Sequence, residues 1–304
     1  MAASLPLPTV LDDDFVPSKN TVWRRFRKHK VALAGLVVLA ILALVAIFAH
    51  FLAPADPNLI DQQHWTGYPL PPGAFGHILG TDEVGRDLLS RLMFGAQISL
   101  TVALFAVVME IVIGTVLGAI SGYYGGWIDF VIMRVTDVVL SIPLLPLLLV
   151  ITAIVEATST KAALSFLVIV VIIGGLSWPS VARLVRASFL SLREREFAEA
   201  ARAVGNRDGR IIFRHLLPNA VAPIIVQATL DVANVILLES TLSFLGFGIQ
   251  PPTASWGNML ANAQSNIVQG PWVAIYPGLC IFVTALAINY VGDGLRDALD
   301  PNSR

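Results

Sequence analysis

Residues 199–218 read EAARAVGNRDGRIIFRHLLP, a charged segment between stretches that are apolar enough to cross a membrane. Residues 193–204 are predicted to form a helix, because Glu, Ala, Arg and Leu favour helices and no proline interrupts them. Gly205 and Asn206 follow, and both tolerate the left-handed conformation that ends many helices. One face of this helix is apolar at helical spacing, and it comprises Phe197, Ala200, Ala201 and Val204. A small apolar face of this kind favours docking in a groove on another protein.

A second, shorter helix is predicted to follow in the same segment. It runs through Ile211, Ile212 and His215. Pro218 is expected to end it, because proline lacks the N–H group of a helical hydrogen bond. Two short helices joined at Gly205 indicate a loop with a structure of its own. The alternative interpretation is an ordinary amphipathic loop that binds no partner.

The composition places the chain in a membrane. With 56% hydrophobic and 13% charged residues, the chain is too apolar for a soluble globular protein. A membrane-spanning helix needs about 20 apolar residues. Six stretches meet this length, at residues 31–53, 98–120, 130–155, 162–182, 220–247 and 273–292. The third carries Arg134 and Asp137 near its start, with Pro143 and Pro146 further on. The predicted fold class is therefore an all-α membrane protein with six transmembrane helices.

Basic residues predict which segments face the cytoplasm. Six Lys or Arg residues crowd residues 19–30, and eight arginines lie within 183–214. Because cytoplasmic segments are enriched in these residues, both regions are expected inside the cell. The predicted organisation has cytoplasmic tails at 1–30 and 293–304, a first helix at 31–53, an extracytoplasmic loop at 54–96, and a five-helix core at 97–292 that contains a cytoplasmic loop at 183–219.

Sequence signatures of catalysis or cofactor binding are absent. The chain has no G-x-x-x-x-G-K-[ST] phosphate loop, no H-E-x-x-H zinc motif and no G-x-S-x-G nucleophile turn. Its five histidines are scattered, and its single cysteine, Cys280, excludes an intramolecular disulfide. The net charge of −1 gives no indication of nucleic-acid binding. Gly122, Gly125 and Gly126 are predicted to form a tight turn between the second and third stretches. We therefore expect neither an enzyme nor a metal or cofactor site.

The charged segment resembles the EAA loop of ABC importer permeases. The similarity rests on Glu199-Ala200-Ala201, then Gly205, then Leu217-Pro218, although His215 stands where that family usually has Ile. In such permeases the loop is a coupling helix that sits in a cleft of the ATPase subunit. The resemblance thus assigns ATPase coupling to Phe197, Glu199, Ala200, Ala201, Val204, Gly205, Leu217 and Pro218.

Four further segments resemble the C-type permease of dipeptide, oligopeptide and nickel importers. They are GTDEVGRDLLSRLMFGAQISL (80–100), GYYGGWIDFVIMRVTDVVLSIP (122–143), FLGFGIQPPTASWG (244–257) and GDGLRDALDP (292–301). The resemblance implies a bacterial inner-membrane protein with four kinds of partner: a second, B-type permease, two ATP-binding subunits that carry ATP and Mg, an extracytoplasmic binding protein, and the lipid bilayer. It implies no cofactor on this chain. Di- or oligopeptides are the expected cargo, with nickel complexes, glutathione or other small solutes as alternatives.

Polar residues in the fifth stretch are candidates for lining a transport pathway. Gln227, Asp231, Asn234 and Thr241 follow one another at offsets of four, three and seven, which places them on one helical stripe. Within a bilayer such a stripe must face protein or water. Asp231 would then attract the ammonium group of a peptide; alternatively, the stripe hydrogen-bonds to neighbouring helices. Glu239 lies off the stripe and is expected to reach the interface, while Glu110 and Asn289 are weaker candidates.

Two other classes of function remain to be distinguished. An ion-coupled secondary transporter would use Asp231 and Glu239 as carriers and would work without ATP. A membrane-embedded enzyme would need a catalytic constellation. Ahead of the second stretch, Thr81 is the predicted N-cap of a helix. Arg86, Asp87 and Arg91 are expected to pair locally, the alternative being contact with a docking protein.

Overall fold

The computed structural model describes residues 19–158 and 163–299. Within these residues the regular structure is helical, and the only strand-like pairings are two isolated bridges, Ile60 with Arg86 and Thr81 with Asp87. Five helices are long and apolar enough to cross a membrane. They are α2 (Lys30–Ile47), α4 (Leu88–Tyr124), α7 (Ala163–Leu192), α10 (Leu217–Phe244) and α12 (Trp272–Leu299). The predicted all-α membrane fold is confirmed.

The third predicted span, residues 130–155, is broken. In place of one helix over residues 130–155, the chain forms α5 (Gly126–Ser141) and α6 (Leu144–Thr158), bent by 84°. The break falls at Ile142, whose backbone is extended with φ −90° and ψ 127°. Pro143 follows it, and a proline disfavours the helical conformation of the residue before it. The prediction of a continuous third helix was therefore wrong, whereas counting the bent pair as one span gives six.

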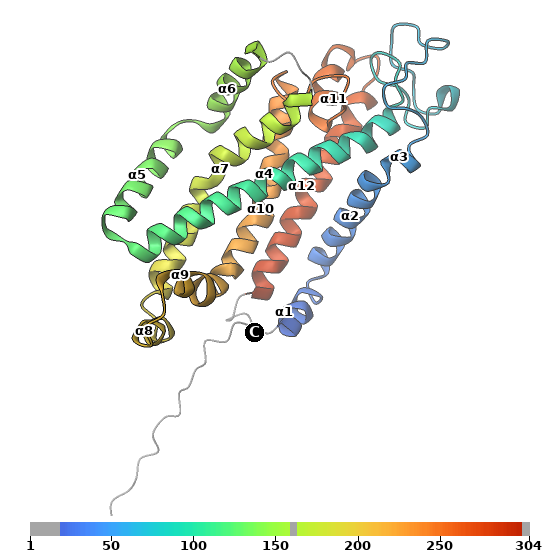
Figure 1. The fold of residues 1–304 in the computed structure, drawn as a ribbon. Helices are drawn as coiled ribbons and strands as arrows, with labels where there is room; N and C mark the ends of the chain where they lie inside the picture. The colour runs from blue at the N-terminus through green and yellow to red at the C-terminus, as the bar shows by residue number, and fades with distance from the viewer. Residues whose placement is uncertain (1–18, 159–162, 300–304) are drawn as a thin grey trace, which may run out of the picture.

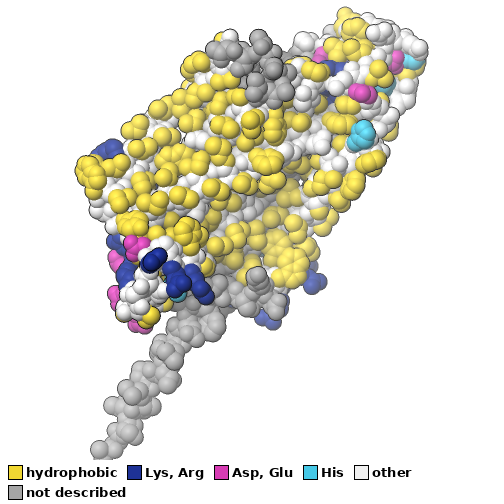
Figure 2. All heavy atoms as spheres, in the orientation of Figure 1, with side chains coloured by type: hydrophobic (Ala, Val, Ile, Leu, Met, Phe, Trp, Pro, Cys, Tyr) yellow, Lys and Arg dark blue, Asp and Glu magenta, His cyan; other side chains and the backbone are white. Residues whose placement is uncertain are grey.

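The two ends of the bundle carry different short elements (Figure 1). One end, called here the α8 end, holds α1 (Lys19–Phe26), α8 (Glu196–Ala203), α9 (Asp208–Arg210), η2 (Ile211–Leu216) and the end of α12. The opposite end, the α11 end, holds α3 (Ala49–Leu52), η1 (Ala74–Gly76), α11 (Trp256–Ala263) and η3 (Gln264–Asn266). Figure 2 shows hydrophobic side chains over the middle of one face, with charged side chains gathered towards both ends. This distribution is the one that a bilayer requires.

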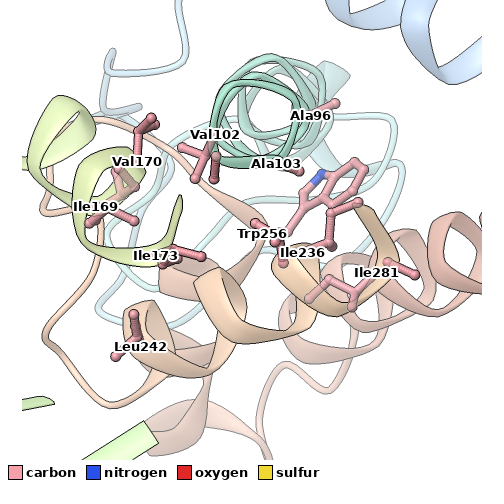
Figure 3. Close-up of a cluster of buried hydrophobic side chains, with 14 of the residues drawn as sticks. Ala96, Val102, Ala103, Ile169, Val170, Ile173, Ile236, Leu242, Trp256 and Ile281 are labelled. Atoms are coloured by element: carbon pink, nitrogen blue, oxygen red, sulfur yellow. The ribbon is translucent and has the colours of Figure 1, made fainter. Parts of the chain in front are cut away.

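A tryptophan from α11 anchors the buried core (Figure 3). Trp256 is fully buried, and its indole N–H donates to the carbonyl oxygen of Leu92 on α4 at 3.1 Å. Around it the core draws on four other helices, with Val102 and Ala103, Ile169 and Ile173, Ile236 and Leu242, and Ile281. The indole satisfies its single donor inside the core, as a buried tryptophan requires. This cluster lies towards the α11 end, and a second buried cluster joins α4, α7, α8 and η2 at the α8 end.

Glycines bring α4 and α7 into close contact. A Cβ atom added at Gly114, Gly118 or Gly122 would lie within 2.6 Å of an atom of α7. This spacing of every fourth residue lets two helix backbones approach closely. Gly122 therefore belongs to the packed interior of α4, and its predicted place in a turn was wrong. Gly125 and Gly126 do form that turn, with φ of 66° and 54°.

Two helix boundaries differ from the predictions. The N-cap of α4 is Asp87, whose carboxylate accepts from the Ser90 N–H at 2.8 Å, and not Thr81. Thr81 instead accepts from the Leu70 N–H through its hydroxyl, so it serves the preceding loop. At the other boundary, α7 continues to Leu192, so the first ten residues of the predicted loop 183–219 are still helical. Hydropathy marks where apolar residues stop, and a helix can continue past that point.

Candidate functional site

The helix α8 is shorter than the segment 193–204 predicted from sequence. Arg193 still belongs to the turn that ends α7, since its N–H donates to the Phe189 carbonyl at 2.9 Å. Its guanidinium also donates to the carbonyl of Gly122 at 3.0 Å, which ties the start of the loop to α4. Arg195 is extended, with φ −81° and ψ 150°, and only then does α8 begin. The loop therefore leaves α7 through a defined bend rather than as a continuous helix.

The end of α8 has the geometry of a glycine cap. Gly205 has a φ of 78°, and its N–H donates to the carbonyl of Arg202 at 2.9 Å. The N–H of Asn206 donates to the carbonyl of Ala201 at 3.2 Å. These two bonds form a Schellman motif, in which the left-handed residue is usually glycine. The predicted left-handed cap is confirmed. A Cβ at Gly205 would meet no atom within 4 Å, so the backbone conformation alone selects glycine.

The predicted apolar face of α8 is divided between the interior and the surface. Ala201 is buried together with Ala198, and both pack in a cluster with residues of η2. Phe197 and Ala200 are exposed, and Val204 is 83% exposed. The charged Glu199 is exposed as well. One side of α8 therefore holds the helix on the bundle, while an apolar side remains uncovered.

The segment after α8 leads directly into a long helix. η2 is a π-helix, and α10 begins at Leu217 with no break. Pro218 occupies the first turn of α10, where no helical hydrogen bond is needed from its nitrogen. The prediction that Pro218 ends a helix was therefore wrong, because the same residue type starts helices as readily as it stops them. Leu217 and Pro218 consequently form the junction between the loop and α10.

The apolar surface at the α8 end extends beyond α8 itself. Phe213 on η2 is 67% exposed, close in sequence to the exposed Arg210 and Arg214. Exposed aromatic and aliphatic side chains among arginines are typical of protein interfaces. The residues assigned to coupling thus include an exposed set, Phe197, Glu199, Ala200, Val204, Gly205 and Pro218, while Ala201 is buried and Leu217 half-buried.

Three of the four polar residues predicted on α10 contact one another. The amide of Gln227 donates to both carboxylate oxygens of Asp231 at 3.0 Å, and the amide of Asn234 lies 3.5 Å from one of them. Glu110 of α4 is buried as well and lies close to Asp231. Thr241 is separate, since its exposed hydroxyl donates to the Leu237 carbonyl of its own helix. Asp231 is buried, so this group joins α4 to α10.

Glu239 lies in the interior and not at the interface that we predicted for it. Its side chain is fully buried. It accepts hydrogen bonds from Ser243 at 2.8 Å and from Ser99 of α4 at 3.1 Å. A serine four residues after a glutamate is visible in the sequence, whereas Ser99 is 140 positions away. The residues that satisfy Glu239 could not be found by helical spacing alone.

The start of α4 forms a compact ionic cluster. Asp82 contacts Arg86 at 2.7 Å and Arg91 at 3.1 Å. Arg91 is buried and also donates to the Pro57 carbonyl at 3.2 Å. The predicted local pairing is thus present, with Asp82 as the shared acid in place of Asp87. This cluster fixes the loop before α4. Because Arg86 and Arg91 are both buried against Asp82, neither is available to a docking protein.

Two known protein families match parts of this chain. Residues 114–304 match the family described as binding-protein-dependent transport system inner membrane component. Residues 20–72 match the N-terminal transmembrane domain of oligopeptide transport permease C. Two family descriptions therefore cover successive parts of the chain.

Curated relatives align along nearly the whole chain. The glutathione transport system permease protein GsiD of Escherichia coli O6:K15:H31 (strain 536) is 41% identical over 301 residues, covering 99% of this chain and 96% of the relative. The dipeptide transport system permease protein DppC of Alkalihalophilus pseudofirmus is 41% identical over 282 residues, covering 93% and 89%.

Solved structures show the same fold at low sequence identity. The MetNI methionine ABC transporter, in an inward-facing conformation, has a chain that matches with a TM-score of 0.55 and 19% identity. The match covers 70% of this chain and 98% of that one. An amino acid ABC transporter solved with histidines matches with a TM-score of 0.52 and 19% identity, covering 68% and 94%.

Proposed function

This chain belongs to the family of binding-protein-dependent transport system inner membrane components, and on that premise we propose how it works within its importer. It is the transmembrane permease subunit of an ABC importer and a multi-pass inner membrane protein. It has no ATPase site of its own, because partner subunits hydrolyse ATP in such importers. We propose that α8 transmits the movement of those partners to the membrane helices.

The proposed assembly has this chain beside a second, B-type permease in the bilayer. Two ATP-binding subunits, loaded with ATP and Mg, bind the α8 end, and an extracytoplasmic binding protein delivers the solute to the α11 end. The α8 end is then cytoplasmic, with residues 1–30, the loop 183–219 and residues 293–304. The arginines of that loop support this orientation. Residues 54–96 lie outside the cytoplasm.

The single observation that carries the coupling proposal is the uncovered apolar side of α8. Val204 is 83% exposed beside the Schellman cap, and Phe197 is 39% exposed. Meanwhile Ala198 and Ala201 anchor the other side to η2, which continues into α10. A force applied to the exposed side therefore reaches a transmembrane helix through packed contacts. Nucleotide-driven closure of the ATPases would tilt α7 and α10 and so alternate access.

The proposed cargo is a di- or oligopeptide, glutathione included. Two relatives at 41% identity are a glutathione permease and a dipeptide permease. Both kinds of molecule are short peptides with a free carboxylate and a free ammonium group. Nickel complexes and other small solutes are the remaining alternatives.

Two valines of matched exposure provide the test of coupling. Val204→Asp places a charge on α8, whereas Val268→Asp places one at the α11 end, where Val268 is 85% exposed. Neither change removes a buried contact. In the complete importer, Val204→Asp is expected to lower co-purification of the ATPase subunits at least about tenfold, because burying an unpaired charge in an interface costs more than about 1.4 kcal/mol. Val268→Asp is expected to leave it unchanged. Equal co-purification for both variants would refute the coupling role of α8.

Gly205 provides a second test of the same coupling. Gly205→Val opposes the left-handed φ with a β-branched side chain, whereas Gly205→Asn keeps a residue that tolerates it. We expect Gly205→Val to abolish most ATP-dependent uptake of labelled dipeptide into proteoliposomes, and Gly205→Asn to retain most of it. Uptake by the wild-type importer on an ion gradient without ATP would instead favour a secondary transporter.

A further inference from the structure

The last turn of α4 lies against the loop that carries α8 (Figure 1). Tyr123, one residue before the end of α4, is half-buried and packs against the cluster that includes Ala198 and Ala201 of α8. Its hydroxyl donates to the carboxylate of Asp208 on α9 at 2.8 Å. The guanidinium carbon of Arg202, at the end of α8, lies 5.9 Å from the centre of its ring. One side chain of α4 therefore contacts both short helices of the loop.

The two polar contacts of Tyr123 lie on opposite sides of the glycine cap. Arg202 precedes Gly205 by three residues, and Asp208 follows it by three. The cap is a left-handed turn of the backbone, and a Cβ at Gly205 would meet no atom within 4 Å. Because the turn has no packed side chain of its own, the ring of Tyr123 is placed to hold α8 and α9 at a fixed angle.

An arginine ties the backbone of the same turn of α4 to the start of the loop. The guanidinium of Arg193 donates to the carbonyl oxygens of Gly122 at 3.0 Å and of Tyr123 at 3.3 Å. The last carbonyls of a helix lack partners within the helix, and a cation is favoured beside them. The end of α4 is thus held both by a residue before α8 and by residues within and after it.

The contacts of Tyr123 are of kinds that resist displacement. A hydrogen bond from a phenol to a carboxylate is charge-assisted, so it is stronger than one between neutral groups. The face of a tyrosine ring also attracts a guanidinium at this distance. The connection of the loop to α10 is different in kind, because there the chain itself continues through η2. α4 is distant in sequence, so its connection to α8 and α9 depends on side chains.

We propose that Tyr123 is a positioning residue for coupling, which holds α8 and α9 as one unit with the end of α4. Closure of the ATPases then moves α4 together with α10. The inference rests on the proposed coupling role of α8 and adds a further transmembrane helix to those that receive its movement.

The first test measures position without measuring transport. In the assembled importer with Cys280→Ser, spin labels at Ala203→Cys of α8 and Val116→Cys of α4, both exposed, report the distance between the two helices. We expect one narrow distance distribution that is the same with and without ATP. Tyr123→Leu should broaden it, whereas Tyr124→Leu, at the exposed neighbouring residue, should not. A nucleotide-dependent distance before any tyrosine is replaced, or an unchanged distribution in Tyr123→Leu, would overturn the proposal.

The second test measures uptake of labelled dipeptide per ATP hydrolysed in proteoliposomes. Tyr123→Phe keeps the ring and removes the hydroxyl. We expect it to lower this ratio roughly threefold, as the loss of one partly exposed hydrogen bond would produce, with the ATPase subunits still bound. Tyr124→Phe is the matched control and should behave as wild type. Asp208→Asn keeps an acceptor oxygen and should retain most of the ratio. A normal ratio in Tyr123→Phe, or loss of its bound ATPases, would contradict the positioning role.

A double substitution tests whether the hydroxyl and the carboxylate act through one bond. Tyr123→Phe combined with Asp208→Ala is expected to lower uptake per ATP no further than Asp208→Ala alone. Additive losses would show that the two residues act separately. Absence of ATP-dependent uptake in the wild type would instead reject the importer function itself, and equal co-purification of ATPases by Val204→Asp and Val268→Asp would reject the coupling role of α8. These failures are therefore distinguishable from a failure at Tyr123.

Discussion

Asp231 illustrates how the surroundings of one residue decide between two roles. It is buried against Glu110 of α4, and Gln227 donates to both of its carboxylate oxygens. The group therefore resembles a polar contact between helices more than a solute-binding surface. This arrangement favours the structural interpretation of the stripe over the pathway interpretation.

Substitutions at Asp231 separate these interpretations. Asp231→Asn keeps the shape and the hydrogen-bonding capacity, so we expect uptake and complex yield near those of the wild type. Asp231→Leu leaves the Gln227 amide without its acceptor, and an unsatisfied buried group costs about 1–3 kcal/mol. Complex yield, measured by size-exclusion chromatography in detergent, should then fall. A strong loss of uptake in Asp231→Asn with normal yield would restore Asp231 to the pathway.

Helical spacing predicted which residues share a face of a helix, but it did not predict which residues of other helices they contact. The stripe of Gln227, Asp231 and Asn234 is on one side of α10, as the offsets predicted. Its contact with Glu110 depends on how α4 packs against α10, which a helical period cannot show. Glu239 is a clearer case. Its buried carboxylate accepts a hydrogen bond from Ser99 on α4, a partner that the spacing within α10 cannot show. Local spacing determines a face, whereas tertiary packing determines what that face meets.

Among the helices, α4 and α7 form a contact that depends on glycine. Gly118 faces Ala182, and a Cβ there would lie 2.5 Å from the Ala182 carbonyl oxygen. Gly118→Val is expected to destabilise the subunit by about 1–3 kcal/mol, because overpacking forces the backbones apart. Val116→Leu, an exposed position on the same helix, is the matched control. Thermal unfolding in detergent should show a lower midpoint for Gly118→Val alone, and equal midpoints would contradict this contact.

Two prolines show which element boundaries the sequence can give. Pro143 breaks the third span because the helix before it has to end, yet the hydropathy of residues 130–155 is continuous and predicts one helix. Pro218 begins α10, although the charged loop before it suggested a helix end. The residue type marks a boundary in both cases. Whether the boundary is a start or a stop depends on the neighbouring hydrogen bonds.

At the scale of the whole molecule, the structure places the basic segments together. α1, α8 and the end of α12 lie at one end of the bundle, as the order of six spans predicted from hydropathy requires. Sidedness relative to the membrane remains a prediction from the positive residues. The packing of the bundle, with α4 against α7 and α10 against α12, had no counterpart in the sequence pattern.

Thiol labelling in intact cells tests the sidedness. In a Cys280→Ser background, Gln63→Cys in the exposed loop before α4 should react with a membrane-impermeant maleimide. Asp208→Cys, exposed at the α8 end, should react only after the membrane is opened. The background protein without cysteine provides the control. The reverse pattern would invert the orientation and remove α8 from reach of cytoplasmic ATPases.

The uninterrupted path from α9 through η2 into α10 has a mechanical consequence. Residues Asp208–Phe244 run as one 37-residue helix from the α8 end to the far side of the bundle. At 1.5 Å per residue this rod is about 55 Å long, so a tilt of about 5° about one end displaces the other by about 5 Å. A lever of this length amplifies a small rotation. A rotation of this helix at the α8 end would therefore also displace its residues at the opposite end of the bundle.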